Sequence, residues 1–577
     1  MAASGMESTT GKTAGATSSA NTAHAPPKTD SSDDMAKRVT PAARMAKLAR
    51  LARARGFLWT AFYNLYAAAV IEGDKEAGFQ LADVLIALRP GEVLPEVDEA
   101  FQLALRTPWI RPASLTRAIV DYLLLDPRVE QITEEVNLST DDLDLAAGVL
   151  AHNELFASLL QTSVANDLRL ERLLIVLRDH LLAVAPSTPG ALRLAALLAT
   201  QANLVEYLWP YTTGPMSAQT IQNRPLPPVT SARALLNCMF RPPNGAEINA
   251  IELIAADPAI SCLLERVRDE PILHTRCRDE LERTAVCLGT SAVNGHNGLM
   301  SGARWVKEPF APRKVPLAVH RRLRARRFEA GDVLVAGCGT GQDLFAVRAT
   351  YPNAHVTALE ANTDKLAHAA RKCAEAGLPL IELLPGSLLD VAPLGWTFDL
   401  IECPGLQRHV PDADFGCEAL ARCSRSGSLL RLAVYSDATC RLVSALRRSA
   451  QMCGISRALG DLQRFRAELL EGLHGALPPS LLQSPEFHTA SGLRDLLFAD
   501  GEVALGTSAW IAMLHIHGFD FVCEEVNGDL VRAARAAGFP GAPLWSVRDS
   551  RRFQREQPFA FGGTQFLWFE RRARLRR

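Results

Sequence analysis

The feature that most constrains the fold of this 577-residue chain is a glycine loop in its second half. Residues 333–343 read VLVAGCGTGQD, so four apolar residues lead directly to glycine at every second position, Gly337, Gly339 and Gly341. A short apolar run predicts a buried strand, and glycines allow positive φ angles and a close approach of the backbone to a ligand. The sequence therefore predicts a strand, a tight loop that holds a ligand, and a helix.

Short apolar segments alternate with helical ones from about residue 317 onward. This alternation is typical of βαβ units around a parallel sheet. The last two expected strands are not cleanly separated by a long crossover helix, so the last is expected to run antiparallel. The expected strands are Val333–Ala336, His355–Leu359, Leu380–Leu384, Phe398–Cys403, Leu429–Tyr435, Phe519–Val526 and Thr564–Glu570.

Helices are expected between these strands. One covers Asp343–Thr350, and the next covers Asp364–Ala376, with Thr363 as its N-cap and Gly377 as its stop signal. A helical insert is expected near 437–475.

The chain before residue 317 has a different pattern. Residues 1–40 are rich in Ala, Ser, Thr and Gly, which predicts a disordered tail. Residues 41–290 carry apolar residues at three-to-four spacing without a clean internal period, which predicts an irregular α-helical domain. Residues 291–316, rich in Gly, Asn and Pro, are expected to form a linker or a cap on the glycine-loop domain, 317–577.

The composition limits the classes of partner that we expect for this chain. Lys and Arg number 62 against 63 for Asp and Glu, so no net charge draws the chain to nucleic acid or to an anionic membrane. The 12 cysteines are scattered without a CxxC pair, which favours reduced thiols and a cytoplasmic location. The apolar run Phe57–Ile71 is shorter than the roughly 20 residues that span a bilayer. We therefore expect no membrane, no nucleic-acid partner and no metal site.

Two ligand classes use a glycine loop of this kind. Dinucleotides prefer Gly-x-Gly-x-x-Gly, whereas S-adenosylmethionine lies over Gly-x-Gly-x-Gly, the spacing seen here. An acid at the end of the following strand can accept hydrogen bonds from ribose hydroxyls, and Glu360 closes the expected strand HVTALE. The pattern favours S-adenosylmethionine and disfavours a nucleotide-dependent oxidoreductase.

The stretch from about Gly331 to Ser436 resembles the class I S-adenosylmethionine-dependent methyltransferases. The matching segments are VLVAGCGTGQD as the glycine loop, ALEAN as the ribose segment, FDLIECPG as the fourth strand and GSLLRLAVYS as the fifth. More narrowly, ATQANLVEYLW, ARWVKEP, SGLRDLLF and TQFLW resemble bacterial members with an N-terminal helical, often tetratricopeptide-type, region. The implied fold is α/β: a Rossmann-like seven-stranded sheet with its last strand antiparallel, preceded by an irregular α-helical domain.

The resemblance also implies a set of cofactor-binding residues. The glycine loop would line the methionine and ribose parts, and Glu360 would bind the ribose hydroxyls. Ser387 stands where the family has an acid that contacts adenine, and the end of the fourth strand at Glu402 would face the reactive sulfonium. The expected cofactor-binding residues are Gly337, Cys338, Gly339, Gly341, Glu360, Ser387 and Glu402.

Methyl transfer is an in-line displacement, so the protein has to align the acceptor and in some cases remove its proton. The candidates for this role are His409 after the fourth strand and Tyr435 at the end of the fifth, with His488 as a further histidine in a loop. Neither a covalent intermediate nor a particular acceptor is implied, because this fold serves protein, small-molecule, lipid and RNA acceptors alike.

Two functions remain open. In the first, the protein is a methyltransferase whose helical region recognises the acceptor or a protein partner. In the second, it is a non-catalytic methyltransferase-fold module that acts as a protein-interaction protein. The second is favoured by Val335, which stands where the family often has an acid near the amino-acid part of the cofactor.

Overall fold

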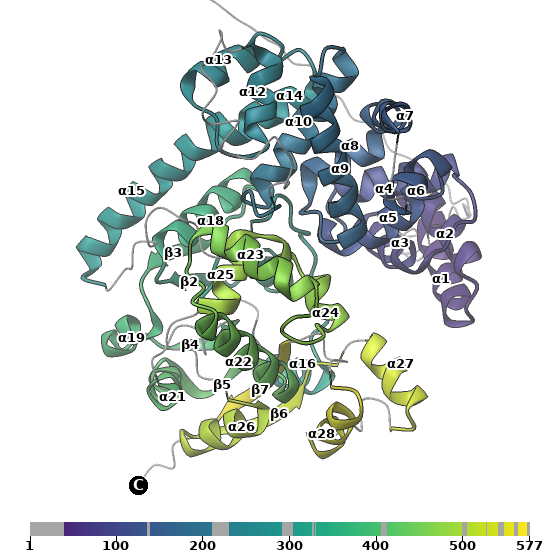
Figure 1. Cartoon of the computed structure of the whole chain (residues 1–577). Helices are drawn as coiled ribbons and strands as arrows, with labels where there is room; N and C mark the ends of the chain where they lie inside the picture. Colours follow the sequence, from purple (N-terminus) through teal and green to yellow (C-terminus); the bar gives the residue numbers. More distant parts are fainter. Residues whose placement is uncertain are drawn as a thin grey trace, which may run out of the picture.

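The structure is a computed structural model. It describes residues 40–134, 139–210, 230–290, 304–325, 328, 331–404, 412–498, 505–526, 528–539, 547–558 and 564–573. In Figure 1 the helices of the first half of the chain occupy the top and right, except α15, which runs down the left side, and the sheet with its own helices lies below them.

The first part is entirely helical in the residues described. Several of its helices begin with proline in the first turn, where the missing N–H costs nothing, as in α4 and α5. A single apolar core extends through it from Ala42 to Leu264. Its elements are α1 (Pro41–Ala54), α2 (Leu58–Tyr66), η2 (Ala67–Ile71), α3 (Lys75–Ala87), α4 (Pro95–Arg106), α5 (Pro112–Leu123), α6 (Pro127–Glu134), α7 (Thr140–Ala151), α8 (Glu154–Thr162), α9 (Leu168–Val184), α10 (Pro189–Leu204), α12 (Ser231–Cys238), α13 (Gly245–Glu252), α14 (Pro258–Leu264), η3 (Glu265–Asp269) and α15 (Glu270–Leu288).

The second part is built on a seven-stranded sheet with the order β3-β2-β1-β4-β5-β7-β6. The first five strands pair in parallel, and β7 lies antiparallel between β5 and β6. The expected fold, including the antiparallel last strand, is confirmed. The strands are β1 (Asp332–Ala336), β2 (His355–Glu360), β3 (Ile381–Pro385), β4 (Phe398–Cys403), β5 (Ser424–Tyr435), β6 (Phe519–Glu524) and β7 (Thr564–Arg571).

Helices cover both faces of the sheet. Alternate residues of each strand face one core or the other, so Val333 and Val335 pack with α16, α17 and α18, whereas Leu334 and Ala336 pack with α19, α21 and α26. The covering helices are α16 (Leu317–Ala325), α17 (Gln342–Thr350), α18 (Thr363–Glu375), α19 (Leu388–Val391), η5 (Ala392–Leu394), α21 (Ala413–Arg422) and α26 (Thr507–Ile516). The sheet part also contains α27 (Gly528–Ala536) and α28 (Val547–Glu556).

A helical insert follows β5 and joins the two parts. Its core includes Leu208, which follows α10 in the first part. Gln463 on α23 donates hydrogen bonds to the backbone carbonyls of Tyr207, at 2.8 Å, and Trp209, at 3.0 Å. The insert comprises α22 (Asp437–Met452), α23 (Leu459–Leu470), α24 (Pro479–Leu482), η6 (Pro485–His488) and α25 (Ala490–Phe498).

One expected cap is wrong. Asn362, not Thr363, is the N-cap of α18, and its side-chain oxygen accepts a hydrogen bond of 3.0 Å from the backbone N–H of Lys365. The helix begins one residue earlier than expected because Asn is at least as good an N-cap as Thr. The stop at Gly377 is as expected, since this residue has a φ of 60° just after the helix.

Within the described ranges, no single helix has both the length and the apolar composition to cross a membrane. The pair α7 and α8, bent by 76°, passes these criteria only when the two helices are taken together.

Candidate functional site

The glycine loop joins β1 to α17 and needs its glycines for two different reasons. Gly337, Gly339 and Gly341 have φ angles of 75°, 58° and 89°, a region that favours glycine. A Cβ on Gly341 would lie 2.6 Å from the Cβ of Ala369, so this glycine lets α17 approach α18. A Cβ on Gly339 would meet nothing within 4 Å. Gly339 is therefore the position at which a ligand can lie against the loop.

Glu360 fixes the loop from the next strand. Its Oε2 accepts the backbone N–H of Gly339 at 2.9 Å, and its Oε1 accepts that of Asn362 at 2.9 Å. The residue is only 1% exposed. These two backbone donors fix the position of the carboxylate beside the loop. The structure thus brings the expected ribose-binding acid directly to the open glycine.

The other expected cofactor residues near the loop have local structural roles. The Cys338 thiol is buried, and burial raises its pKa well above the usual range, so it remains neutral. Ser387 is the N-cap of α19, where its hydroxyl donates to the carboxylate of Asp390 at 2.9 Å. Ser387 is half-buried, and its role toward adenine remains a prediction.

Glu402 lies in a buried ionic network on the sheet face under α17. It is 2% exposed and pairs with Arg313 and, at 3.3 Å, with Arg431. Arg313 also pairs with Asp343 at 2.6 Å. Burial would raise the pKa of Asp343, but Arg313, Arg111 and Arg431 outweigh it and hold the pKa below its usual range. Glu402 is therefore held by two arginines, and its contact with a cofactor remains a prediction.

The three candidate aligning residues differ in what the structure shows of them. His409 lies outside the described residues. Tyr435 ends β5 and is 9% exposed. His488 lies at the junction of the two parts, where its Nδ1 is 2.9 Å from Glu171 on α9 and its Nε2 is 2.8 Å from the carbonyl oxygen of Leu482. The structure thus accounts for His488 as a structural residue.

Trp305 was not singled out from the sequence, yet it holds the glycine loop from outside. Its indole Nε1 donates to both the backbone oxygen and the hydroxyl of Thr340, each at 3.1 Å. Its ring packs edge-on against Phe345 on α17 and His368 on α18. Residues 304–309, called the capping segment below, therefore cover this corner of the sheet domain.

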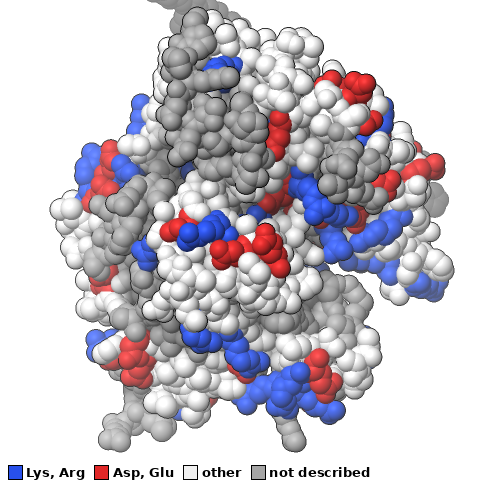
Figure 2. Space-filling model, in the orientation of Figure 1, with Lys and Arg blue, Asp and Glu red and all other residues white. Residues whose placement is uncertain are grey.

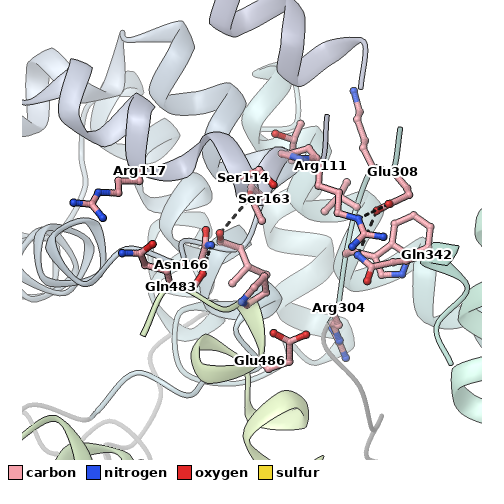
Figure 3. Close-up of a pocket in the computed structure, with 18 residues that line it drawn as sticks. Arg111, Ser114, Arg117, Ser163, Asn166, Arg304, Glu308, Gln342, Gln483 and Glu486 are labelled. Carbon is pink, nitrogen blue, oxygen red and sulfur yellow. Dashed lines mark hydrogen bonds and ion pairs between the residues drawn. The ribbon is translucent and has the colours of Figure 1, made fainter. Parts of the chain in front are cut away.

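A cavity of about 330 Å³ lies beside the start of α17, between the helical part, the capping segment and the insert (Figure 3). Asn166 donates to the carbonyl oxygen of Gln483 at 2.7 Å, and its own buried Oδ1 has no hydrogen-bond partner within the described residues. The cavity is lined by Arg111, Pro112, Ala113, Ser114, Arg117, Thr162, Ser163, Val164, Asn166, Arg304, Trp305, Val306, Lys307, Glu308, Gln342, Gln483, Pro485 and Glu486.

Glu308 is the carboxylate that links this cavity to the glycine-loop helix. It pairs with Arg111 at the start of α5, and Gln342, the first residue of α17, approaches it at 3.4 Å. Burial raises the pKa of Glu308 to about 7, although Arg111 acts in the opposite direction. Sequence reasoning missed this residue because its partner Arg111 lies almost two hundred residues earlier, with no local signal to connect them.

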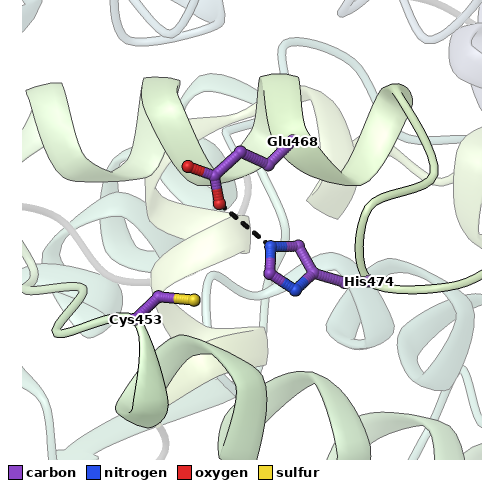
Figure 4. Close-up of side chains that lie close together, drawn as sticks. All are labelled: Cys453, Glu468 and His474. Carbon is purple, nitrogen blue, oxygen red and sulfur yellow. Dashed lines mark hydrogen bonds and ion pairs between the residues drawn. The ribbon is translucent and has the colours of Figure 1, made fainter.

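Two further features, the charge of the surface and a group of three side chains in the insert, do not indicate a ligand. Figure 2 shows Lys, Arg, Asp and Glu interspersed over the visible face. In the insert, Cys453, Glu468 and His474 lie together, with their ligand atoms within 4.8 Å of one another (Figure 4). His474 Nε2 lies 2.9 Å from a Glu468 oxygen, and this pairing accounts for both groups without a metal.

Comparison with known families gives the class of the sheet domain. Residues 333–427 match the family model described as a methyltransferase domain. The matched segment begins in β1, includes the glycine loop and Glu360, and ends within β5. The chain therefore carries a methyltransferase domain.

Individual relatives cover only part of the chain. An uncharacterised protein of Synechococcus sp. is 36% identical over 115 residues, which is 20% of this chain and 28% of that protein. PKMT2 from Rickettsia typhi is 17% identical over 42% of this chain and 49% of that chain, with a TM-score of 0.30. A second structure of PKMT2 is a complex with AdoHcy. An S-adenosylmethionine-dependent methyltransferase from Clostridium acetobutylicum is 18% identical over 22% of this chain and 51% of that chain, with a TM-score of 0.19.

Proposed function

We propose that this protein is an S-adenosylmethionine-dependent methyltransferase whose helical part contributes to acceptor recognition. The observation that carries the proposal is the contact between Glu360 and the backbone N–H of Gly339. It combines an open glycine, where nothing within 4 Å blocks a ligand, with an acid suited to ribose hydroxyls. The match of residues 333–427 to a methyltransferase domain supports the same assignment.

The residues present fit this cofactor. Gly339 offers open space, and Glu360 offers acceptors for the ribose hydroxyls. When bound, S-adenosylmethionine supplies an activated methyl group. The residues of the protein orient the acceptor, exclude water and take up its proton, and we assign these tasks to Tyr435 and His409.

The carboxylate that is missing at Val335 has a counterpart on the neighbouring strand β4. Val335 pairs in register with Glu402 of β4, so the two side chains lie next to each other on the same face of the sheet. Glu402 therefore places a carboxylate beside the position where the family often carries one. The same carboxylate pairs with Arg313 and Arg431, so its contact with the amino-acid part of the cofactor is part of the proposal.

We assign the 330 Å³ cavity beside α17, whose lining does not include Tyr435, to a part of the methyl acceptor that lies away from the reacting atom. It combines residues from the helical part with Gln342, which directly follows the glycine loop. The Oδ1 of Asn166 is a buried acceptor without a hydrogen-bond partner among the described residues, and it suits an N–H or O–H donor on the acceptor. This arrangement gives the helical part a direct role in acceptor recognition.

Thermal unfolding with added ligands tests the cofactor assignment. A ligand at a hundred times its Kd stabilises the folded state by about 2.7 kcal/mol. We expect S-adenosylhomocysteine to raise the melting temperature and NAD to leave it unchanged. A shift with NAD alone would point to an oxidoreductase, and no shift with either ligand would leave the non-catalytic module as the better account.

A pair of variants locates the site. Gly339→Arg fills the open space and should abolish the S-adenosylhomocysteine shift. Gly377→Arg is the matched control, because Gly377 has nearly the same φ, 60° against 58°, and the same open surroundings just after α18. If Gly339→Arg keeps the shift, or if both variants lose it equally, the placement of the site is wrong.

A further inference from the structure

A second cavity, of about 260 Å³, lies between α15, α18 and the end of α10. Neither the glycine-loop contacts nor the proposed acceptor cavity account for it. It is lined by Asn203, Leu204, Arg266, Glu270, Pro271, His274, Thr275, Arg278, Arg304, Trp305, Asp364, His368 and Arg371.

The lining is rich in basic side chains. It contains four arginines and two histidines but only two acids, Glu270 and Asp364. Each acid is already shared between two basic side chains. Glu270 lies 3.3 Å from Arg371 and 3.7 Å from Arg266. Asp364 lies 3.4 Å from His274 and 3.7 Å from Arg278. Outside the lining, Glu375 pairs with Arg371 at 2.7 Å and Glu206 with Arg304 at 3.3 Å, so only within the lining itself do basic side chains outnumber acids.

Five buried side-chain nitrogens of this lining have no hydrogen-bond partner within the residues described. Two of them, Nε of Arg278 and Nε of Arg304, still lie 3.6 Å from Glu282 and 3.3 Å from Glu206. The other three belong to buried residues: Nε of Arg266, Nε of Arg371 and Nε2 of His368. Their residues are 8%, 7% and 4% exposed. Buried polar groups in folded proteins nearly always have a partner, so three in one cavity need an explanation. A ligand that accepts hydrogen bonds provides one.

The electrostatic environment is positive at His368. Burial holds the pKa of its imidazole well below the usual range, and Arg371, Lys372, Arg304 and His274 lower it further. The ring is therefore neutral, and one of its nitrogens carries a hydrogen that can be donated. A cation would be repelled here, whereas an anion would be attracted.

We propose that this cavity is a binding site for a phosphate-type oxyanion. Guanidinium groups donate in a planar fork that matches phosphate oxygens, and several arginines on different elements can share one such ion. The unpartnered Nε groups of Arg266 on η3 and Arg371 on α18, together with His368 on α18 in its Nε2–H tautomer, supply hydrogen bonds from two sides. Free phosphate and the phosphoryl group of a small organic ester share this chemistry.

The site is coupled by contact to the glycine loop. Arg304 and Trp305 line this cavity and also the 330 Å³ cavity. Trp305 donates to Thr340 within the loop. An anion held by Arg304 would therefore hold the capping segment in its place on the loop.

Calorimetric titration of the full chain tests the proposal, with inorganic phosphate and glycerol 3-phosphate added separately at constant ionic strength. We expect saturable one-to-one binding of at least one of them. Tighter binding of the ester would identify an organic phosphate as the ligand, and equal binding would identify the free anion. Absence of saturable binding with both compounds would overturn the proposal.

Two threonines on α15 provide a matched pair of variants. The hydroxyls of Thr275 and Thr284 each donate to the carbonyl oxygen four residues earlier, at 2.9 and 3.0 Å, but only Thr275 lines the cavity. Thr275→Glu adds a negative charge at the cavity without removing a buried group, and it should weaken phosphate binding at least tenfold. Thr284→Glu should leave the affinity within twofold. Equal affinities for the two variants would contradict the assignment. The proposal does not depend on cofactor binding, because phosphate alone is the probe.

Discussion

At the scale of single residues, one sequence pattern turns out to contain two kinds of position. The every-other spacing of the glycines predicts positive φ angles at all three, and the structure confirms them. The spacing alone cannot distinguish Gly341, which packs against Ala369, from Gly339, which faces open space. That difference depends on where α18 lies, and α18 follows only after another strand. The candidate acid Glu360 could be predicted, whereas its hydrogen bond to Gly339 could not.

A second residue-scale feature is the charge of Glu171. Burial would raise its pKa, but Arg466 and His488 lower it to about 2. A carboxyl whose pKa is lower in the folded than in the unfolded protein stabilises the fold above its unfolded pKa. This stabilisation is lost as the pH falls from about 4.5 to about 2. The shift corresponds to about 3 kcal/mol.

We therefore expect the free energy of unfolding of the wild type to fall over this acidic range. Glu171→Gln removes the titrating group, so its unfolding free energy should be lower than that of the wild type at neutral pH, with the gap narrowing toward pH 2. Urea unfolding at several pH values measures both curves. A gap that stays constant over this range would show that Glu171 does not titrate as described.

At the scale of elements, the strand pattern was predictable because each strand is a short apolar run between turn residues. The expected and observed strands agree within about two residues except at the start of β5. That strand begins at Ser424, whereas the expected one begins at Leu429. The early residues read SRSGS, and Gly427 has a φ of 74°, so this end looks like a loop in the sequence. Pairing with β4 at Ser424 makes it a strand, and such pairing is not visible locally.

The junction of α9, α23 and η6 tests how the two parts are joined. Arg466 on α23 is 3% exposed and pairs with Glu171 at 2.6 Å. Arg466→Met leaves the buried carboxylate without its main partner, which should cost about 3–5 kcal/mol. Arg464→Met is the control on the same helix, because Arg464 is 54% exposed and pairs with Asp461 at the surface. Its cost should be below about 1 kcal/mol. Chemical unfolding measures both, and equal costs would contradict a buried inter-part ion pair.

At the scale of the whole molecule, the two cavities lie where the helical part meets the sheet domain. Arg111 and Asn166 come from the helical part, Glu308 from the capping segment and Gln342 from α17. The glycine loop is a local pattern and was therefore predictable. A single sequence contains no signal that pairs residues so far apart, so the cavities beside the loop were not predictable. The expected boundaries of the helical domain and the tetratricopeptide-type likeness remain predictions.

The contact between Trp305 and the glycine loop gives a prediction at this scale. Trp305→Phe keeps an aromatic ring but removes the N–H that donates to Thr340. A net hydrogen bond contributes about 0.5–1.5 kcal/mol, so S-adenosylhomocysteine should bind about three- to tenfold more weakly. Trp396→Phe, at a tryptophan with 38% exposure after η5, should leave the affinity unchanged. Equal affinities for Trp305→Phe and the wild type would show that the cap does not support the loop.

The most direct test of the central claim is the affinity of S-adenosylhomocysteine measured by calorimetry for the wild type and for Glu360→Gln. We predict saturable one-to-one binding to the wild type. The variant loses the charge that holds the loop and that would hold the ribose in the proposed function, so the affinity should fall by about tenfold or more, since hydrogen bonds to charged groups contribute about 1.5–3 kcal/mol. Glu382→Gln, at an exposed position on β3, should bind like the wild type. Absence of binding to the wild type, or equal binding to Glu360→Gln, would contradict the proposed function.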